Sequence, residues 1–245
     1  FDPRLITAVP RAVAQAAMNS GVARRPIIDM DAYEAELSAR LNPTAGSLHG
    51  IFEELRKNPK RVVFAEGEEE KSIRAAYAFL NGSFGTPILI GREERVRSTM
   101  DQLGLPASAA IEIVNSKLSP STADYINLLY ERLQRRGYLE RDCVRMVNRD
   151  RNVFGALMVQ SGDADALVTG LTRNYHMALD QITRVLDPAA GSHVFGLSMV
   201  MTQGKTLFVA DTAIHEVLSP EQMADIAQQA AAVARGLGHE PRVAL

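Results

Sequence analysis

The chain has 245 residues, of which 46% are hydrophobic, and its 27 basic side chains nearly balance its 29 acidic ones. This length and apolar content are enough for one large or two small globular domains with a buried core. The balanced charge, with no long run of lysine and arginine, argues against a nucleic acid partner, and no apolar run is long enough to predict a membrane span.

The single cysteine, Cys143, indicates a reducing compartment, because it has no partner for an internal disulfide and no CxxC companion. We expect it in the core. The first residues lack the basic and apolar regions of a signal peptide, so cytoplasmic residence is the default expectation. The chain starts at Phe1 and stops in the strand-like run 241–245, which suggests an excerpt from the middle of a longer polypeptide.

The N-terminal part of the chain is predicted to be helical. Apolar residues fall near helical spacing over residues 2–20, where Gly21 provides a stop, and further helices are predicted over 31–41 and 44–58. We interpret these three helices as a connector.

An alternation of strands and helices follows the third helix. Buried strands are predicted over 61–65, 87–90 and 111–114, separated by a helix that Gly82 ends and by a helix over 92–103. This order at this spacing is typical of a parallel sheet with crossover helices.

An acidic run, Glu66 to Glu70, comes directly after the first of these strands. Carboxylates in the first turn of a helix are stabilised by the helix dipole. A cation site is the alternative, but a solvated helix start is the interpretation that we prefer.

The stretch 163–186 carries the clearest functional signal. Helices predicted over 122–136, 140–149 and 152–160 lead into it, and it opens with a short buried strand, Ala166 to Val168. A turn of small residues and a further helix complete it.

The turn Thr169–Gly170 and the helix start behind it are candidates for anion binding. A strand, a glycine turn and a helix start present free backbone N–H groups and the positive end of the helix dipole together. Arg173, Asn174 and His176 add a cation, an amide and an imidazole at the same place.

A structural role is the alternative for this turn. Most such turns in α/β proteins only connect two elements, and folds host many functions. Arg173 would then pair with Asp163 or Asp165 instead of a ligand.

Two further strands are predicted over 194–201 and 206–210. Gly204–Lys205 between them is typical of a hairpin turn, so part of the second sheet is expected to be antiparallel. Asp211 follows the second strand, where ligands bind in open α/β sheets; it serves either a ligand or the cap of a turn.

The last predicted helix starts at Ser219, which opens a capping box with proline at the first helical position. An apolar stripe follows, of the kind that packs in a core, and the helix is expected to end at Gly236 or Gly238.

Motifs for metals and nucleotides are missing from the sequence. None of the five histidines stands in HExxH or beside CxxC, so no metal site is predicted. GxSxG and GxxxxGK[ST] do not occur, which excludes the hydrolase elbow and the P-loop NTPase.

Five segments from Asn58 onward together resemble the phosphate acetyltransferase family. They are KRVVFAEGEEEKSIRAA, GTPILIGREE, DADALVTGL, TLFVADTAIHE and GHEPRVAL. The first segment of the chain, FDPRLITAVPRAVAQAAMNSGVARRPI, looks like the closing helix and exit of a bacterial malic enzyme domain. The arrangement resembles the hybrid NADP-dependent malic enzymes, which carry a phosphotransacetylase-like C-terminal region.

The resemblance implies an α/β fold, an αβα sandwich with a mostly parallel sheet in two lobes, preceded by connector helices. Residues 1–57 would be the end of the malic enzyme domain and the connector. Residues 58–150 would form one lobe, with its sheet completed near 241–245 and beyond, and residues 151–240 the other.

The resemblance also indicates lost chemistry. Active members place an arginine in a YELR pattern, where this sequence has Leu133, with Arg132 one residue earlier. A slip of one residue rotates a helical side chain by about 100°. In the turn that matches SGAxHSxxDTxRP, Tyr175 and Ala178 replace hydroxyl residues and Asp180 replaces the arginine, which reverses the sign of the local field.

Regulation is the function that the resemblance implies: acetyl-CoA binds this region and inhibits malate decarboxylation in the malic enzyme domain of the same polypeptide. NADP and a divalent metal would belong to that domain, outside this chain, and the protein would be a homo-oligomer, either a dimer or a hexamer assembled from dimers. The expected ligand contacts are Thr169, Gly170, Arg173, Asn174, His176 and Asp211.

Two alternatives remain open at this point. One is an active phosphate acetyltransferase that makes acetyl-CoA and phosphate from acetyl phosphate and CoA. The other is a purely structural oligomerisation module.

Overall fold

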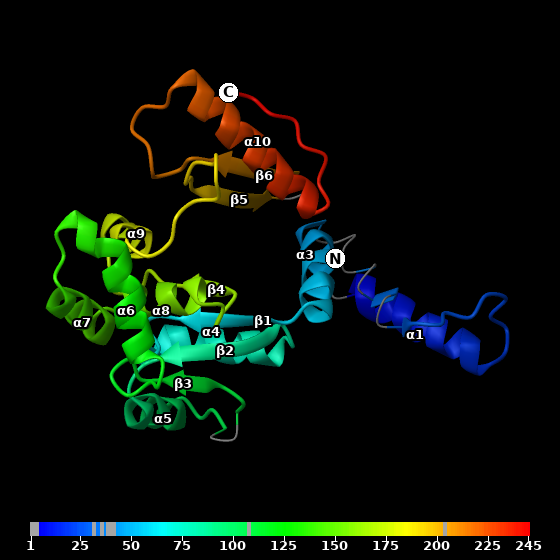
Figure 1. Ribbon diagram of the computed structural model, residues 1–245. Helices are drawn as coiled ribbons and strands as arrows, with labels where there is room; N and C mark the ends of the chain where they lie inside the picture. The colour runs from blue at the N-terminus through cyan, green and yellow to red at the C-terminus, as the bar shows by residue number, and fades with distance from the viewer. Residues whose placement is uncertain (1–4, 31–32, 35–36, 38–42, 107–108, 203–204) are drawn as a thin grey trace. The chain divides into compact units, whose positions relative to one another are not determined.

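The structure is a computed structural model that describes all residues except 1–4, 31–32, 35–36, 38–42, 107–108 and 203–204 (Figure 1). The chain forms two compact units, which are described separately. We call residues 55–187 the sheet unit, and residues 1–54 together with 188–245 the hairpin unit.

A parallel sheet organises the sheet unit. Its strands are β1 (Lys60–Phe64), β2 (Gly85–Ile90), β3 (Glu112–Val114) and β4 (Ala166–Val168). They lie in the order β3-β2-β1-β4, and every neighbouring pair is parallel (Figure 1). The predicted α/β class with a parallel sheet is therefore confirmed.

Helices α4 (Glu70–Asn81) and α5 (Glu93–Gln102) cover one face of this sheet. Strand side chains alternate between faces, so Val62, Phe64 and Leu89 pack in one core with Ile73, Val96 and Met100 of these helices.

The other face packs against helices that follow β3 in sequence. Val63, Ile88 and Ile90 point into this second core, which includes Leu129, Phe154 and the fully buried Cys143, as predicted. The helices on this side of the chain are α6 (Thr122–Leu133), the 3-10 turn η1 (Gln134–Arg136), α7 (Glu140–Arg149), α8 (Arg151–Gln160) and α9 (Tyr175–Thr183).

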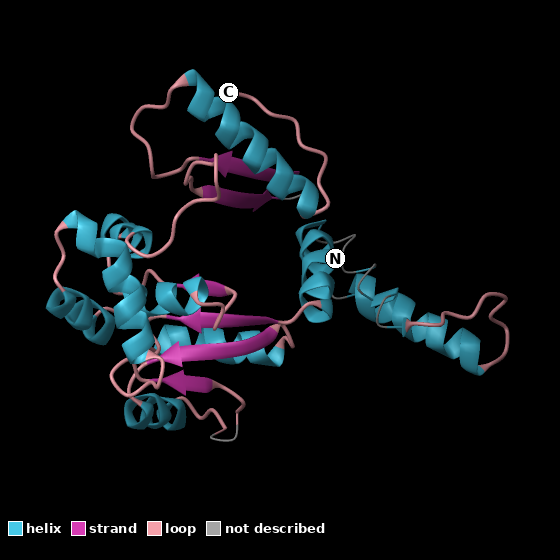
Figure 2. Ribbon diagram, viewed as in Figure 1, coloured by secondary structure: helices cyan, strands magenta, loops and turns pink. Residues whose placement is uncertain are grey.

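The hairpin unit contains an antiparallel pair, β5 (Leu197–Thr202) and β6 (Lys205–Ala210), as the sequence predicted (Figure 2). Helix α10 (Pro220–Gly236) packs beside β6 and begins with the predicted capping box: Ser219 Oγ accepts from Gln222 N, and Gln222 Oε1 accepts from Ser219 N.

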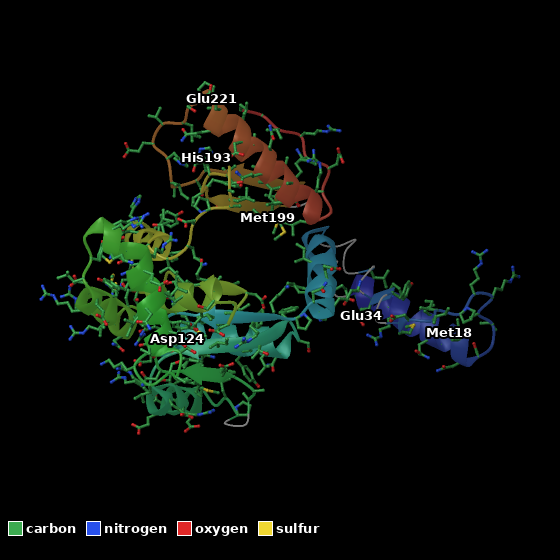
Figure 3. The ribbon with its side chains drawn as sticks, viewed as in Figure 1. Met18, Glu34, Asp124, His193, Met199 and Glu221 are labelled. Atoms are coloured by element: carbon green, nitrogen blue, oxygen red, sulfur yellow. The ribbon has the colours of Figure 1, made fainter. Side chains whose placement is uncertain are left out.

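His193 precedes β5, and its Nδ1 lies 2.8 Å from a carboxylate oxygen of Asp225 on α10 (Figure 3). Helices α1 (Leu5–Asn19) and α3 (Pro43–Lys57) match the first and third helices predicted for the N-terminal part. The second, over 31–41, falls largely outside the described residues.

Two sequence-based expectations about organisation differ from the structure. A boundary at 150/151 would separate β4 from β1, yet Val63 and Leu167 are register partners in one sheet. The structure assigns no strand to residues 241–245. The compact units instead divide near residues 54 and 187.

Among the described helices, none combines the length and apolar character needed to cross a lipid bilayer.

Candidate functional site

The carboxyl ends of β1 and β4 meet at the point where the strand order reverses. The chain leaves β1 toward β2 and β3 on one side, and returns to place β4 on the other. In open α/β sheets, ligands bind outside the carboxyl ends of the strands at such a switch point. The predicted turn after β4 and the acidic run after β1 both lie at this edge.

The carboxylate of Glu66 fills the turn that was predicted to receive an anion. It accepts hydrogen bonds from the backbone N–H groups of Gly170 at 3.1 Å, Leu171 at 3.0 Å and Thr172 at 2.7 Å. The hydroxyl of Thr172 donates a fourth, at 2.9 Å. The prediction of free N–H donors at this turn is therefore wrong, because an internal carboxylate already occupies them.

Gly170 makes this geometry possible. Its φ of 121° lies in a region that L side chains rarely adopt, and it turns consecutive N–H groups toward one acceptor. Burial opposes ionisation of Glu66, but the hydrogen bonds from Thr172, Leu171 and Gly170 outweigh it and lower the pKa of this carboxyl below its usual range. Glu66 is only 4% exposed, so it is not part of a solvated helix start.

A chain of buried polar side chains extends from this turn into the helices. Thr169 Oγ1 lies 2.6 Å from Asn152 Oδ1, and Asn152 Nδ2 donates to Gln181 Oε1 at 2.8 Å. Asn152 and Gln181 are both buried. The network links β4 to α8 and α9, and it fixes the position of Thr169 from the inside.

A small cavity of about 240 Å³ opens beside the turn. Of the predicted contact residues, Thr169, Gly170 and Arg173 line it, together with Tyr175, Ala178, Leu179 and Ile182. Arg173 is exposed, and its Nη1 lies 3.4 Å from Met177 Sδ. The alternative pairing is not found: Asp163 accepts from the Tyr125 hydroxyl and Asp165 from the Arg61 N–H.

Asn174 and His176 have separate roles at the start of α9. Asn174 is the N-cap, and its side-chain oxygen accepts from Met177 N at 2.9 Å. His176 is exposed, with its ring edge-on to Tyr175 at a centroid distance of 5.8 Å. Neither residue lines the small cavity.

A cluster of arginines surrounds Glu68, two residues after Glu66. The Glu68 side chain is only 6% exposed, and its oxygens lie 3.1 Å from Arg92 Nε, 3.5 Å from Arg95 Nε and 3.2 Å from Arg151 Nη2. Burial disfavours the charged form, but hydrogen bonds from Arg92 and the positive charge of Arg151 lower the pKa of Glu68 to about 2. Like Glu66, this residue is not solvated, contrary to the expectation for the acidic run.

Asp211 belongs to the hairpin unit, so it is described apart from the other predicted residues. It follows β6 with a φ of 55°, and its Oδ2 lies 3.1 Å from His215 Nδ1. Its Oδ1 is buried and finds no hydrogen-bond partner among the described residues.

Within the part of the chain that the structure describes, no three His, Cys, Asp or Glu side chains cluster in a way that could hold a metal ion.

Comparison with known proteins identifies this architecture. Residues 47–245 match the phosphate acetyl/butaryl transferase family. The chain belongs to that family. A phosphotransacetylase from Staphylococcus aureus has a similar structure, with a TM-score of 0.73 and 26% identity over 80% of this chain and 59% of that one.

Full-length relatives of this phosphate acetyl/butaryl transferase domain include malic enzymes. An NADP-dependent malic enzyme of Rhizobium meliloti (strain 1021) is 52% identical over all of this chain, which covers 32% of that protein. One from Escherichia coli (strain K12) is 38% identical, also over all of this chain and 33% of its own length. A phosphate acetyltransferase of the same E. coli strain is 30% identical over 86% of this chain and 29% of its own. The chain thus spans about a third of the length of the malic enzymes that it matches.

The positions at which the sequence departs from the pattern of active members make contacts within the sheet unit. Leu133 is fully buried, and Arg132 donates to Asp187 at 2.7 Å and to the Arg184 carbonyl at 2.8 Å. Asp180, at the position where the resemblance implies an arginine in active members, pairs with Arg184 at 2.5 Å. Arg132 and Arg184 are therefore each paired with a carboxylate of the same unit.

Sequence reasoning missed the residues that shape this edge: Glu66, Glu68, Asn152 and Gln181. Acidic runs and amides are common on surfaces, so residue type alone did not distinguish these four. Only Glu66 and Glu68 carried a signal, since they directly follow a buried strand that ends at the ligand-binding edge of a parallel sheet.

Proposed function

We propose that this domain is the regulatory region of an NADP-dependent malic enzyme, which converts malate to pyruvate and CO2, and that it binds acetyl-CoA as an allosteric inhibitor without transferring the acetyl group. NADP and a divalent metal would bind in the malic enzyme domain, outside this chain. The intact protein would be a homo-oligomer.

Asp180 is the observation that carries the proposal. Asp180, on the same helix as cavity residues Ala178, Leu179 and Ile182, supplies a carboxylate where active members, by the resemblance, present a guanidinium to acetyl phosphate. Positioned cations stabilise the charge that develops on a phosphoryl-bearing substrate, and losing one typically costs about 10²-fold or more in rate. The burial of Leu133 at the second arginine position points the same way.

The surface beside the cavity supports recognition of a ligand that is apolar at one end and anionic at the other. Leu171, Tyr175 and Met177 are exposed next to Arg173. Exposed large apolar side chains in a group usually mark a binding surface. The long malic enzyme relatives supply the catalytic partner that such a sensor needs.

The test uses the full-length protein in two assays. Acetyl transfer from acetyl phosphate to CoA is expected to be undetectable, whereas acetyl-CoA is expected to bind by calorimetry and to lower malate turnover. Because allosteric coupling is reciprocal, malate and NADP together should weaken acetyl-CoA binding. Measurable acetyl transfer would contradict the proposal, and so would malate turnover that acetyl-CoA leaves unchanged.

A further inference from the structure

The arginines around Glu68 carry more positive charge than one carboxylate can neutralise. Arg92, Arg95 and Arg151 all lie within 3.5 Å of its oxygens, so three guanidinium groups face a single negative charge. Two positive charges are left over in a fixed arrangement. Such surplus charge at a rigid cluster attracts an external anion.

The three arginines are held in place, yet open to solvent. Glu68 is anchored because its Oε1 accepts from the backbone N–H of Arg92 at 3.0 Å, which ties the segment after β1 to the start of α5. The side chains of Arg92 and Arg95 are 62% and 63% exposed, and that of Arg151 is 35% exposed. Preorganised donors lose little entropy when they bind a ligand.

The position of the cluster suits a ligand that also reaches the small cavity. Arg92 follows β2 and Glu68 follows β1, so the cluster lies at the same carboxyl edge as the turn that Glu66 fills. Arg151 directly precedes Asn152, which bonds Thr169 of that turn.

A larger cavity of about 960 Å³ borders the cluster, and Arg92 is part of its wall. Acidic residues of this cavity are largely engaged: Glu93 pairs with Arg97 at 3.4 Å, Glu112 with Arg61 at 3.8 Å, and Asp163 accepts from Tyr125. Glu94 also lines the cavity. The three arginines therefore leave positive charge beside this cavity that Glu68 alone does not neutralise.

We propose that Arg92, Arg95 and Arg151 form a binding site for a phosphate or diphosphate group, and that it takes the phosphorylated nucleotide portion of the acyl-CoA effector. The second part rests on the proposed function. Guanidinium groups bind phosphate oxygens through two parallel N–H donors, which a diphosphate on a nucleotide can satisfy at more than one arginine.

The experiment compares Arg95→Gln with the wild type in the full-length protein. Arg95 has the longest contact to Glu68, so its replacement leaves Arg92 and Arg151 to hold that carboxylate. Arg74→Gln is the matched control: it removes the same charge from an exposed arginine that pairs with Glu70 on α4 at 2.9 Å. Thermal unfolding checks that both variants fold.

Calorimetry with acetyl-CoA and with S-acetylpantetheine, which lacks every phosphate, gives the readout. Arg95→Gln is expected to weaken acetyl-CoA binding about tenfold, to leave S-acetylpantetheine binding unchanged, and to flatten the dependence of acetyl-CoA affinity on salt. The Arg74→Gln control should stay within about twofold of the wild type. Acetyl-CoA binding that is equal in both variants would overturn the phosphate site and leave the proposed function intact.

Inorganic pyrophosphate separates the two proposals if acetyl-CoA does not bind the wild type. Pyrophosphate binding that Arg95→Gln abolishes would then support the phosphate site while the proposed function fails. A wild type that binds neither acetyl-CoA nor pyrophosphate would overturn both.

Discussion

Glu66 and Glu68 lie two residues apart after β1, and their carboxylates serve different neighbours. Glu66 accepts hydrogen bonds from backbone N–H groups of the turn after β4, whereas Glu68 forms ion pairs with arginines at the starts of α5 and α8. Gly67 between them packs so closely that an added Cβ would lie 2.8 Å from the backbone N and O of Ile90. Glu66 thus links the turn after β4 to the end of β1, and Glu68 links the starts of α5 and α8 to it.

Replacing Glu66 with glutamine tests how much the hydrogen bonds between Glu66 and the turn after β4 stabilise the fold. The amide keeps one acceptor oxygen and places an NH2 donor where the other carboxylate oxygen stood, so some of the N–H donors of Gly170, Leu171 and Thr172 lose their acceptor. We expect Glu66→Gln to lower the free energy of unfolding by about 2 kcal/mol. Urea denaturation measures this change.

Glu69→Gln is the control for that variant. Glu69 is exposed, and its side chain makes no cap hydrogen bond at the start of α4. Its replacement should change stability by less than about 0.5 kcal/mol. Equal effects at Glu66 and Glu69 would show that the turn does not depend on the Glu66 carboxylate.

At the scale of elements, the segment after β1 approaches the end of β2 closely at Gly67, and α10 begins with a capping box. A side chain added at Gly67 would collide with backbone atoms of Ile90, which cannot move aside as a flexible side chain does. The capping box of α10 supplies acceptors for backbone N–H groups that a helix otherwise leaves unpaired at its start.

Gly67→Ala is expected to destabilise the sheet unit by about 2 kcal/mol or more, because the new methyl group would overlap the Ile90 backbone. Gly50→Ala in α3 is the control: no atom lies within 4 Å of its added Cβ, so the helix should gain up to about 1 kcal/mol. Chemical denaturation of both variants measures the difference. A neutral Gly67→Ala would mean that β1 and β2 can separate at little cost.

Ser219→Ala removes the side-chain acceptor of the α10 capping box, in which Ser219 Oγ accepts from Gln222 N at 3.2 Å. The expected cost is about 1 kcal/mol. Gln228→Ala, an exposed position within the same helix, should be close to neutral. Thermal unfolding compares the two, and a loss at Gln228 as large as at Ser219 would contradict a specific role for the cap.

At the scale of the whole molecule, acidic groups with lowered pKa values couple stability to pH. The shifts are downward at Glu66, Glu68, Asp187 and Asp225. A carboxyl whose pKa is lower in the folded state stabilises the fold above its unfolded pKa, and this contribution disappears as pH falls through the folded pKa. The pKa shift of Asp150 has the opposite sign, because burial raises the pKa of this carboxyl.

The net expectation is loss of stability as pH falls from about 4.5 toward about 2, the window between the ordinary pKa of a glutamate side chain and the folded-state pKa of Glu68. Urea midpoints at several pH values between 7 and 2.5 measure it. Glu68→Gln should flatten the slope in this window, because the glutamine does not titrate there. A wild-type midpoint that stays constant below pH 4.5 would contradict the prediction.

Periodicity predicted most elements of the fold because it reports burial locally. Short continuous apolar runs identified β1, β2 and β4, and the capping box at Ser219 located the start of α10. The domain boundaries were not predictable in this way, because the pairing of Val63 with Leu167 joins residues more than a hundred positions apart.

The candidate site shows the same division. The sequence by itself determined the parallel α/β class, the turn after β4 and the presence of Asp180 and Leu133, since these follow from local pattern and residue identity. Only the tertiary structure decided that Glu66 occupies the turn and that three arginines gather on Glu68. Those contacts depend on which strand ends lie side by side, and strand order arises from long-range packing that no local pattern encodes.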